Sequence, residues 1–420
     1  MSAAYYDPMF YLCSAEMPFT IRIEVTFKQP VDPDALREAA NAAVRRYPYF
    51  AVQVVSEGGE LVCRPNLRPL AVYPGPEVRP LGSEGVGRHL LAFSYEGSLM
   101  CLFASHVIAD GAGLFPYIKT LLYEYLARVL PAAPDPAGLP MVDSPFFPDE
   151  LGNPFPEAKM AAAAPLYLPP KRDFFRLRDG GFVTDAQRTV YRFRVKESEV
   201  MAYNQDHDGS PCALVSSLMA KAIWELHPEN EKDIVSAVSF NLRPGLGNGH
   251  SWRMLCSYLP LRYPARLRDA PPVKLCTCSR GMVTLMSQPE NVLVYAQKTR
   301  ERMEALLQIP GVAAKRAALA PAALRDSTEN TFSVSYVGKM GLGSLEQHLD
   351  SIYNLTDGST YQAAFIEISS VGGWFDIAFL QGFSSDVYVR AFLRQLTACG
   401  LSYIEGSVTP LGTPAMELPE

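Results

Sequence analysis

The sequence has little of what marks a metal centre, a disulfide scaffold or a membrane protein. Its eight cysteines are scattered over 420 residues, and most lie in apolar segments, as reduced cysteines of cytosolic proteins do. Cys276-Thr-Cys278 has no second Cys/His pair at zinc spacing, and no H-E-x-x-H occurs, so we expect no bound metal. No apolar run approaches the ~20 residues that span a bilayer.

Basic clusters and targeting signals are also lacking. The net charge is −6, and no basic patch stands out that could neutralise phosphates, which argues against a nucleic-acid partner. The opening Met-Ser-Ala-Ala-Tyr-Tyr-Asp shows no basic region followed by an apolar stretch, so we expect no secretory signal and a cytoplasmic location.

Two familiar enzyme motifs are missing as well. No G-x-S-x-G occurs, which counts against an esterase of the α/β-hydrolase kind. Gly245-Leu-Gly247-Asn-Gly249 follows a strand, but no helix is expected after it, so a plain loop is favoured over a dinucleotide site.

What the sequence does contain is material for two lobes. With 420 residues, 48% apolar and 20% charged, the chain can fill two cores. We predict an α/β (α+β) fold with lobes at 1–170 and 171–420, each a mixed β-sheet flanked by helices. Asp32-Pro33 supplies an N-cap and a first-turn proline for one helix. The expected strands are 20–27, 50–55, 60–63, 90–95, 99–106, 189–195, 233–241, 331–337, 362–370 and 374–379, and the expected helices are 34–46, 114–129, 197–204, 212–226 and 385–403.

Residues 131–170 differ from the rest of the chain, since they hold eleven of the 35 prolines. We predict that this segment crosses between the lobes. Apolar side chains within it indicate that it lies against the fold rather than forming a free tether. They are Phe146, Phe147, Phe155, Leu166 and Tyr167.

The stretch that carries chemistry is Phe103-Ala-Ser-His106-Val-Ile-Ala-Asp110-Gly111-Ala-Gly113. Strand alternation places Leu102, Ala104 and His106 on one face, so the imidazole emerges where a buried strand ends. With an ordinary pKa of ~6.5, a histidine there can serve as a general base. Two structural interpretations stay open, a hydrogen-bonded histidine at a strand end and an Asp110 that only caps the following helix.

This H-x-x-x-D-G between a strand and a helix resembles the signature of the chloramphenicol acetyltransferase-like superfamily. That group includes condensation domains, plant BAHD acyltransferases and alcohol acetyltransferases. The resemblance extends to Asn241-Leu-Arg243-Pro244, which is similar to the Asn-x-Arg-Pro strand end of the family, and to Ser335-Tyr336-Val-Gly338, which resembles its Ser-Asn-x-Gly segment.

The resemblance implies a role for each of these residues. His106 would lie in a tunnel between the lobes and take a proton from the acceptor, while Gly111 allows the backbone turn. Asp110 would point away from the substrates and pair with Arg243, which holds the two halves of the chain together. Ser335 and Tyr336 are candidate donors to the oxyanion, although a core position for Tyr336 is at least as well supported.

The implied activity is transfer of an acyl group from acyl-CoA to a hydroxyl or amine of a small molecule, with no permanently bound cofactor. Ser105 stands where condensation domains usually have a second histidine, and no Asp-Phe-Gly-Trp-Gly of the plant type appears. Two alternatives therefore remain open. One is a stand-alone condensation-type enzyme that uses a phosphopantetheine thioester on a carrier protein. The other is a non-catalytic binding protein of the same fold.

Overall fold

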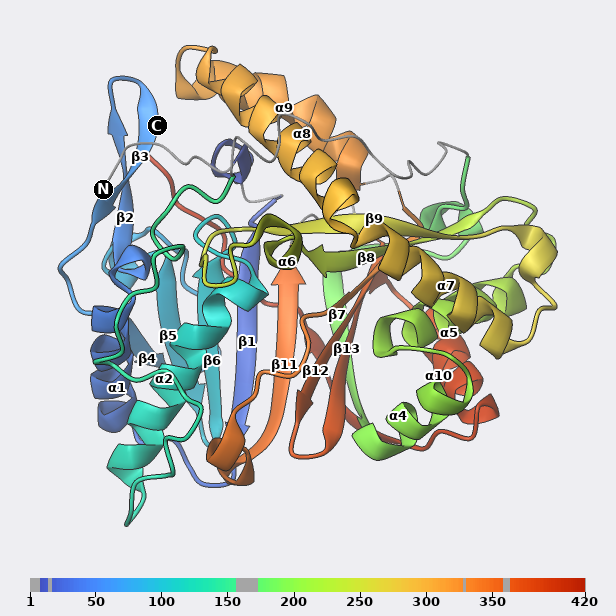
Figure 1. Cartoon of the computed structure of the whole chain (residues 1–420), viewed down its shortest axis with the longest axis horizontal. Coiled ribbons are helices and arrows are strands. Elements are labelled where there is room, and N and C mark those ends of the chain that lie inside the picture. The colour runs from blue at the N-terminus through green and yellow to red at the C-terminus, as the bar shows by residue number, and fades with distance from the viewer. Residues whose placement is uncertain (1–7, 14–16, 156–172, 328–329, 358–362, 420) are drawn as a thin grey trace.

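The computed structural model of the chain shows two lobes side by side, each built on one large β-sheet (Figure 1). The residues that it describes are 8–13, 17–155, 173–327, 330–357 and 363–419. Within them, no helix is long and apolar enough to cross a membrane. Leu166, Tyr167 and the rest of the predicted crossover after residue 155 lie outside the described residues.

The first lobe contains a mixed five-stranded sheet in the order β11-β1-β6-β5-β4. Its neighbouring strands are antiparallel except for the parallel pair β4 and β5. Two helices, α1 (Pro33–Arg46) and α2 (Gly111–Val129), lie together on one face of the sheet (Figure 1). The strands are β1 (Thr20–Phe27), β4 (Ala71–Pro74), β5 (Leu91–Glu96), β6 (Leu99–Ser105) and β11 (Leu349–Asp357), beside a separate hairpin of β2 (Val52–Glu57) and β3 (Glu60–Pro65).

The second lobe contains a mixed seven-stranded sheet in the order β14-β7-β13-β12-β10-β8-β9, in which β10 runs parallel to both of its neighbours. Helices α5 and α10 pack against each other in this lobe, and α8 and α9 extend across the top of the molecule (Figure 1). The strands are β7 (Thr184–Lys196), β8 (Ile234–Asn241), β9 (Cys256–Tyr263), β10 (Phe332–Tyr336), β12 (Ala364–Val371), β13 (Trp374–Phe383) and β14 (Tyr403–Pro410). The helices are α4 (Glu197–Asp206), α5 (Pro211–Leu226), α6 (Arg243–Leu246), α7 (Pro272–Met286), α8 (Pro289–Leu307), α9 (Val312–Ser327) and α10 (Val387–Ala398).

The seam between the lobes runs along the outer edge of β11. Alternate backbone N–H groups on this edge point away from β1, and an unpaired strand edge of this kind must be satisfied by other acceptors. Side chains of the second sheet accept them: Ile352 donates to Asp376 Oδ2 at 2.8 Å, Asn354 to Ser369 Oγ at 3.3 Å, and Thr356 to Glu367 Oε1. The seam is therefore closed by side chains instead of a continuous backbone ladder.

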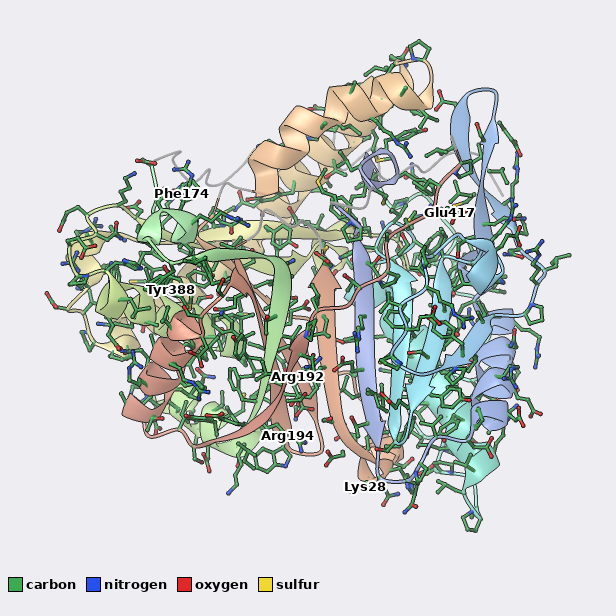
Figure 2. All side chains as sticks on the ribbon, turned by 180° about the vertical axis from the view of Figure 1, so that it is seen from behind. Lys28, Phe174, Arg192, Arg194, Tyr388 and Glu417 are labelled. Atoms are coloured by element: carbon green, nitrogen blue, oxygen red, sulfur yellow. The ribbon has the colours of Figure 1, made fainter. Side chains whose placement is uncertain are left out.

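Arginines of β7 reinforce this seam from behind, where Figure 2 shows Arg192 and Arg194 at the boundary between the sheets. Arg192 donates twice to Glu24 of β1, at 2.8 and 2.9 Å, and Arg188 donates to Asp357 of β11 at 3.0 Å. Because these groups are buried, each arginine must stay in contact with its carboxylate to offset the cost of desolvation. These contacts fix the position of the two sheets relative to each other.

The C-terminal segment after β14 crosses back to the first lobe, where Figure 2 labels Glu417. Thr20 donates its hydroxyl to Pro414 O at 2.9 Å, and Ser105 donates its hydroxyl to the sulfur of Met416 at 2.8 Å. The first lobe thus takes both β11 and the C-terminal segment from the 171–420 part of the chain. The proposed boundary at residue 170 falls outside the described residues and stays a prediction.

Several elements differ from those that the sequence predicts. The helix expected over 385–403 ends at Ala398, because Gly400 adopts a φ of 76° and turns the chain into β14. The helices α7, α8 and α9 were not predicted. Of the apolar residues in the predicted crossover, Phe155 is buried, whereas Phe146 and Phe147 are exposed.

Candidate active site

His106 is the first residue after β6, at the start of the turn that leads into α2. Its backbone N–H donates to Phe19 O at 2.6 Å, just before β1, which fixes the end of the strand pair. The imidazole is half-buried, and its Nδ1 is buried without a hydrogen-bond partner. No hydrogen bond joins the ring to a side chain of another described residue, and the groups that act on it are the Asp110 carboxylate and the backbone of His106 and Ala109.

Burial lowers the pKa of His106 below its ordinary value of 6.5, because desolvation disfavours the imidazolium. The Asp110 carboxylate and the backbone groups of His106 and Ala109 oppose this effect without cancelling it. The imidazole is therefore mainly neutral at pH 7, which is the form that accepts a proton.

Asp110 lies at the N-terminus of α2 and is 2% exposed. Its Oδ1 accepts from the backbone N–H of Gly113 at 2.8 Å, which makes it the N-cap of the helix. Its Oδ2 accepts from the backbone N–H of Leu255 at 2.8 Å, just before β9 of the second lobe. Two further bonds come from Arg243, at 2.8 and 2.9 Å. With four donors, the carboxylate has little capacity left for a substrate.

Arg243, at the start of α6, has all five of its guanidinium N–H groups bonded. Two go to Asp110, and the other three go to Ser251 O, Asn241 Oδ1 and Arg253 O, at 2.7, 3.1 and 2.6 Å. Full satisfaction of a buried, bidentate pair is the condition under which such a pair is stable. The pair joins the His106–Asp110 turn of the first lobe to the second lobe.

Two glycines at the start of α2 allow the lobes to approach. A Cβ on Gly111 would lie 3.1 Å from Val337, on the segment that follows β10. A Cβ on Gly113 would lie 2.0 Å from the carbonyl oxygen of Trp252, far inside van der Waals contact. Gly113, which the sequence analysis did not assign a role, is therefore the more strictly required of the two.

We expect Gly113→Ala to lower the free energy of unfolding by about 1–3 kcal/mol, because the methyl group must push the Trp252 backbone away. Gly281→Ala in α7 is the matched control, since its Cβ would meet nothing within 4 Å and alanine favours a helix by roughly 0.5–1 kcal/mol. Urea unfolding of both variants should give shifts of opposite sign. Equal shifts would contradict the close packing at Gly113.

Ser335 and Tyr336 project from opposite faces of β10, because strand side chains alternate. The Tyr336 ring packs edge-on against Phe375 with centroids 5.6 Å apart, in the core of the second lobe. Burial raises the pKa of Tyr336 to about 12. Ser335 shares its face with Val337, which contacts Gly111, so Ser335 is the one of the two on the side of the His106 turn.

Two residues on this side of the second sheet had no sequence motif to reveal them. Glu367 of β12 is paired in register with Ser335 and is 4% exposed. Tyr258 of β9 is paired with Ser239 of β8. The Tyr258 side chain is 46% exposed. Desolvation raises the pKa of its hydroxyl, and Cys256 and Glu367 add to that rise. Strand alternation could have placed both side chains on a face, but not next to the other lobe.

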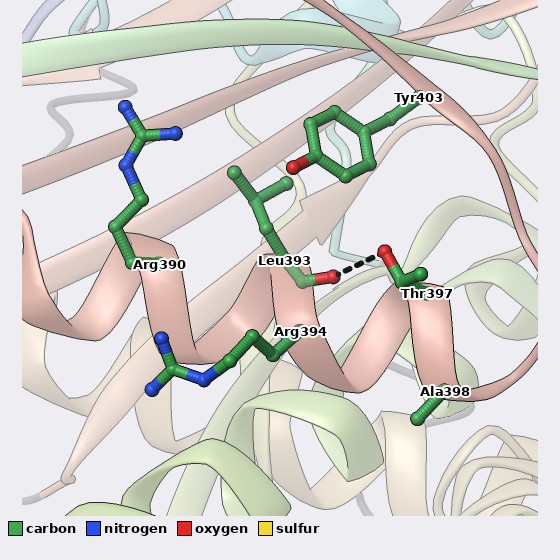
Figure 3. A pocket seen from close by; sticks show the side chains of 6 residues that line it. All are labelled: Arg390, Leu393, Arg394, Thr397, Ala398 and Tyr403. Carbon is green, nitrogen blue, oxygen red and sulfur yellow. Dashed lines mark hydrogen bonds between the residues drawn. The ribbon is translucent and has the colours of Figure 1, made fainter.

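No group of three or more His, Cys, Asp and Glu side chains that could hold a metal occurs among the described residues. A surface pocket over α10, shown in Figure 3, is lined by Arg390, Arg394 and Tyr403. Arg390 is already paired with Asp386 and Glu405, and Arg394 with Glu225. The pocket therefore offers no free cation to an anionic ligand and is separate from the His106 turn.

No protein-family model and no curated protein matches this sequence. The structure, in contrast, is similar to solved structures over nearly its whole length. Polyketide synthase associated protein 5 from Mycobacterium tuberculosis is 16% identical with a TM-score of 0.60, covering 93% of this chain and 95% of that one. TRI101 of F. sporotrichioides, solved with coenzyme A and T-2, is 11% identical with a TM-score of 0.58, covering 94% and 98%. The condensation domain of the Monacolin K polyketide synthase MokA is 14% identical with a TM-score of 0.56, covering 98% and 97%.

Proposed function

We propose that this protein, which has the chloramphenicol acetyltransferase-like fold, transfers an acyl group from an acyl-CoA thioester to a hydroxyl or amine of a small molecule. The observation that carries the proposal is the state of His106. Its imidazole has a buried Nδ1 without a side-chain partner, is mainly neutral, and stands on a turn that the Asp110–Arg243 pair fixes between the lobes. The fold alone would not support catalysis, because one fold can host many functions.

In the proposed mechanism, the acceptor attacks the thioester carbonyl carbon while His106 takes the proton from the attacking oxygen or nitrogen. The tetrahedral intermediate then breaks its carbon–sulfur bond. The departing thiolate takes the proton back from the imidazolium, which leaves the acylated acceptor, free CoA and neutral His106. Asp110 does not take part in proton transfer, because its oxygens are saturated by the donors described above.

The oxyanion of the intermediate needs a hydrogen-bond donor, which can contribute ~3–4 kcal/mol. Ser335 is the better of the two predicted candidates, since its side chain lies on the face that meets the His106 turn and the Tyr336 ring packs in the opposite core. The donor substrate is proposed as CoA, a choice supported by the coenzyme A present in the TRI101 structures.

The proposal is tested by incubating the purified protein with a panel of acyl-CoA esters and small alcohols and amines. Release of free CoA must depend on the acceptor, and the acylated product must appear by mass spectrometry. The same acyl groups are offered on a phosphopantetheine-loaded carrier protein, because the likeness to the MokA condensation domain favours this second donor type. Turnover with the carrier alone would replace CoA in the proposal. Ligand-induced melting shifts without any product would favour a binding protein.

The pH dependence of kcat/KM for an alcohol acceptor should show one acidic limb with a midpoint below pH 6.5. Because the pKa of His106 is lowered, the neutral base persists as the pH falls and is lost only below that lowered value. The profile is best measured in the Glu367→Gln background, which removes one of two buried carboxyls whose pKa is raised to about 7, the other being Asp376. A limb at or above pH 6.5 that stays unchanged when Asp376→Asn is added to that background would rule out His106 as the titrating base.

A further inference from the structure

Six carboxylates are buried among the described residues, and five of them have an arginine within ion-pair distance. A buried charge without a counterion costs several kcal/mol, so this pairing is expected. The five pairs are Glu24 with Arg192, Asp110 with Arg243, Glu150 with Arg46, Asp357 with Arg188, and Asp376 with Arg194. Glu367 is the sixth, and no lysine or arginine of the described chain forms an ion pair with it.

Glu367 lies on the side of β12 that meets the first lobe. Its Oε1 accepts from the backbone N–H of Thr356 on β11. This bond satisfies the strand edge but supplies no positive charge. Burial raises the pKa of Glu367 to about 7, and Thr356 and the more distant Arg188 only partly oppose this effect. Among the described residues, Glu367 is therefore a buried carboxyl without an ion-pair partner of its own, since Arg188, which also acts on it, is paired with Asp357.

The strand register places this carboxyl at the level of the proposed base. Ser105, the residue before His106, is paired with Thr20 of β1, and Thr20 is paired with Asp357, the residue after Thr356. His106 and Glu367 are thus separated by two hydrogen-bonded strand spacings of about 4.8 Å each and by the seam between β11 and β12. The Glu367 carboxylate crosses this seam to Thr356 of β11, so the two side-chain groups lie on the order of 10 Å apart.

The face of the second sheet that carries Glu367 becomes more exposed toward β9. Ser335 adjoins it on β10, and Ser239 of β8 and Tyr258 of β9 follow across the next two strands. Tyr258 is half-exposed and Ser239 is partly exposed, so a molecule that approaches from β9 meets hydroxyl groups before it meets the carboxylate. Hydroxyls and an unpaired carboxylate together suit a polar cation.

We infer that Glu367 binds a cationic group of the acceptor. The acceptor would then be an amino alcohol or a diamine, with its ammonium group on the order of 10 Å from the hydroxyl or amine that is acylated. This inference rests on the proposed function in one respect, namely that the bound molecule is the acceptor of an acyl group. The binding of a cation by Glu367 does not depend on turnover. The ammonium would replace the missing arginine and form a charge-assisted hydrogen bond with the carboxylate.

The test uses two probes of matched length, 8-amino-1-octanol and the neutral 1,8-octanediol, titrated calorimetrically into the protein without an acyl donor. We expect the wild type to bind the amino alcohol at least ~10-fold more tightly than the diol, the low end for a desolvated charge pair. Glu367→Gln should lose ~10-fold for the amino alcohol and less than about 2-fold for the diol. The glutamine oxygen can still accept from Thr356, so the variant should fold. Glu96→Gln, an exposed change at the far end of β5, should alter neither affinity.

The wild-type comparison needs no variant, so a failure of Glu367→Gln to fold would not prevent the test. Equal affinity of the wild type for both probes, or no binding of the amino alcohol, would overturn the inference. So would an equal loss for both probes in Glu367→Gln. Acyl transfer from acetyl-CoA to each probe is followed separately. Preferential binding of the amino alcohol without acyl transfer would support the inference and contradict the proposed function. Acyl transfer without preferential binding would support the proposed function and contradict the inference.

Discussion

His106→Ala is expected to lower kcat/KM for acyl transfer at least ~100-fold, the low end for loss of a general base. The imidazole is the only candidate base on the turn that joins β6 to α2, since Asp110 is saturated by Gly113, Leu255 and Arg243. The fold should survive the change, because no side chain of another described residue bonds to Nδ1 and the ring acts only on Asp110 and on the nearby backbone of its own turn. The measurement is steady-state CoA release at pH 7.5, with thermal unfolding to establish that the variant is folded.

The matched control for this prediction is His348→Ala. The His348 backbone carbonyl accepts from Lys28 N at 3.0 Å, at the opposite end of β11 from Thr356, and its side chain forms no hydrogen bond with another described residue. Its removal should leave kcat/KM within about 2-fold of the wild-type value, because this histidine does not act as the general base. Transfer that persists at a near-normal rate in folded His106→Ala would refute the proposed mechanism.

Arg243→Met is expected to lower the free energy of unfolding by about 3–5 kcal/mol, because it leaves Asp110 buried with an uncompensated charge. It also removes the bonds to Ser251 O and Arg253 O that hold the chain before β9. The turn that carries His106 loses its fixed position, and displacements of about 1 Å can cost up to ~100-fold in rate. Urea unfolding and kcat/KM, measured at a temperature where the variant is folded, test both effects.

Arg46→Met separates the two effects of that substitution. Arg46 forms an equally buried, bidentate pair with Glu150, at 2.7 and 2.9 Å, which bonds neither Asp110 nor Arg243, although the neighbouring Asp149 accepts from His250. Its loss should cost stability by a similar ~3–5 kcal/mol while kcat/KM of the folded variant stays near normal. Loss of activity in both variants to the same degree would mean that stability alone, and not the position of the His106 turn, accounts for the Arg243 effect.

Much of the local structure was predictable because it depends on neighbours in sequence. Asp32-Pro33 starts α1 as expected, with the Asp32 carboxylate accepting from the N–H groups of Asp34 and Ala35. The strand predicted at 99–106 corresponds to β6, which ends at Ser105, next to His106. The likeness to solved structures confirms the predicted fold class. The helices α7 to α9 and the strand β14 were missed, since their apolar residues show weak periodicity and β14 is mostly exposed.

By itself, the sequence determined the chemistry that is available: one histidine at a strand end, a helix-capping aspartate, and an Asn-x-Arg-Pro segment far along the chain. Only the tertiary structure decided which partners those groups find, because pairing depends on residues 133 positions apart for Asp110 and Arg243. The same holds for Gly113. Only glycine fits at this position, because a Cβ would collide with the Trp252 carbonyl oxygen of the other lobe. Glu367 is the clearest case, since a buried carboxylate without an ion-pair partner is visible only after the arginines of the described residues have been placed.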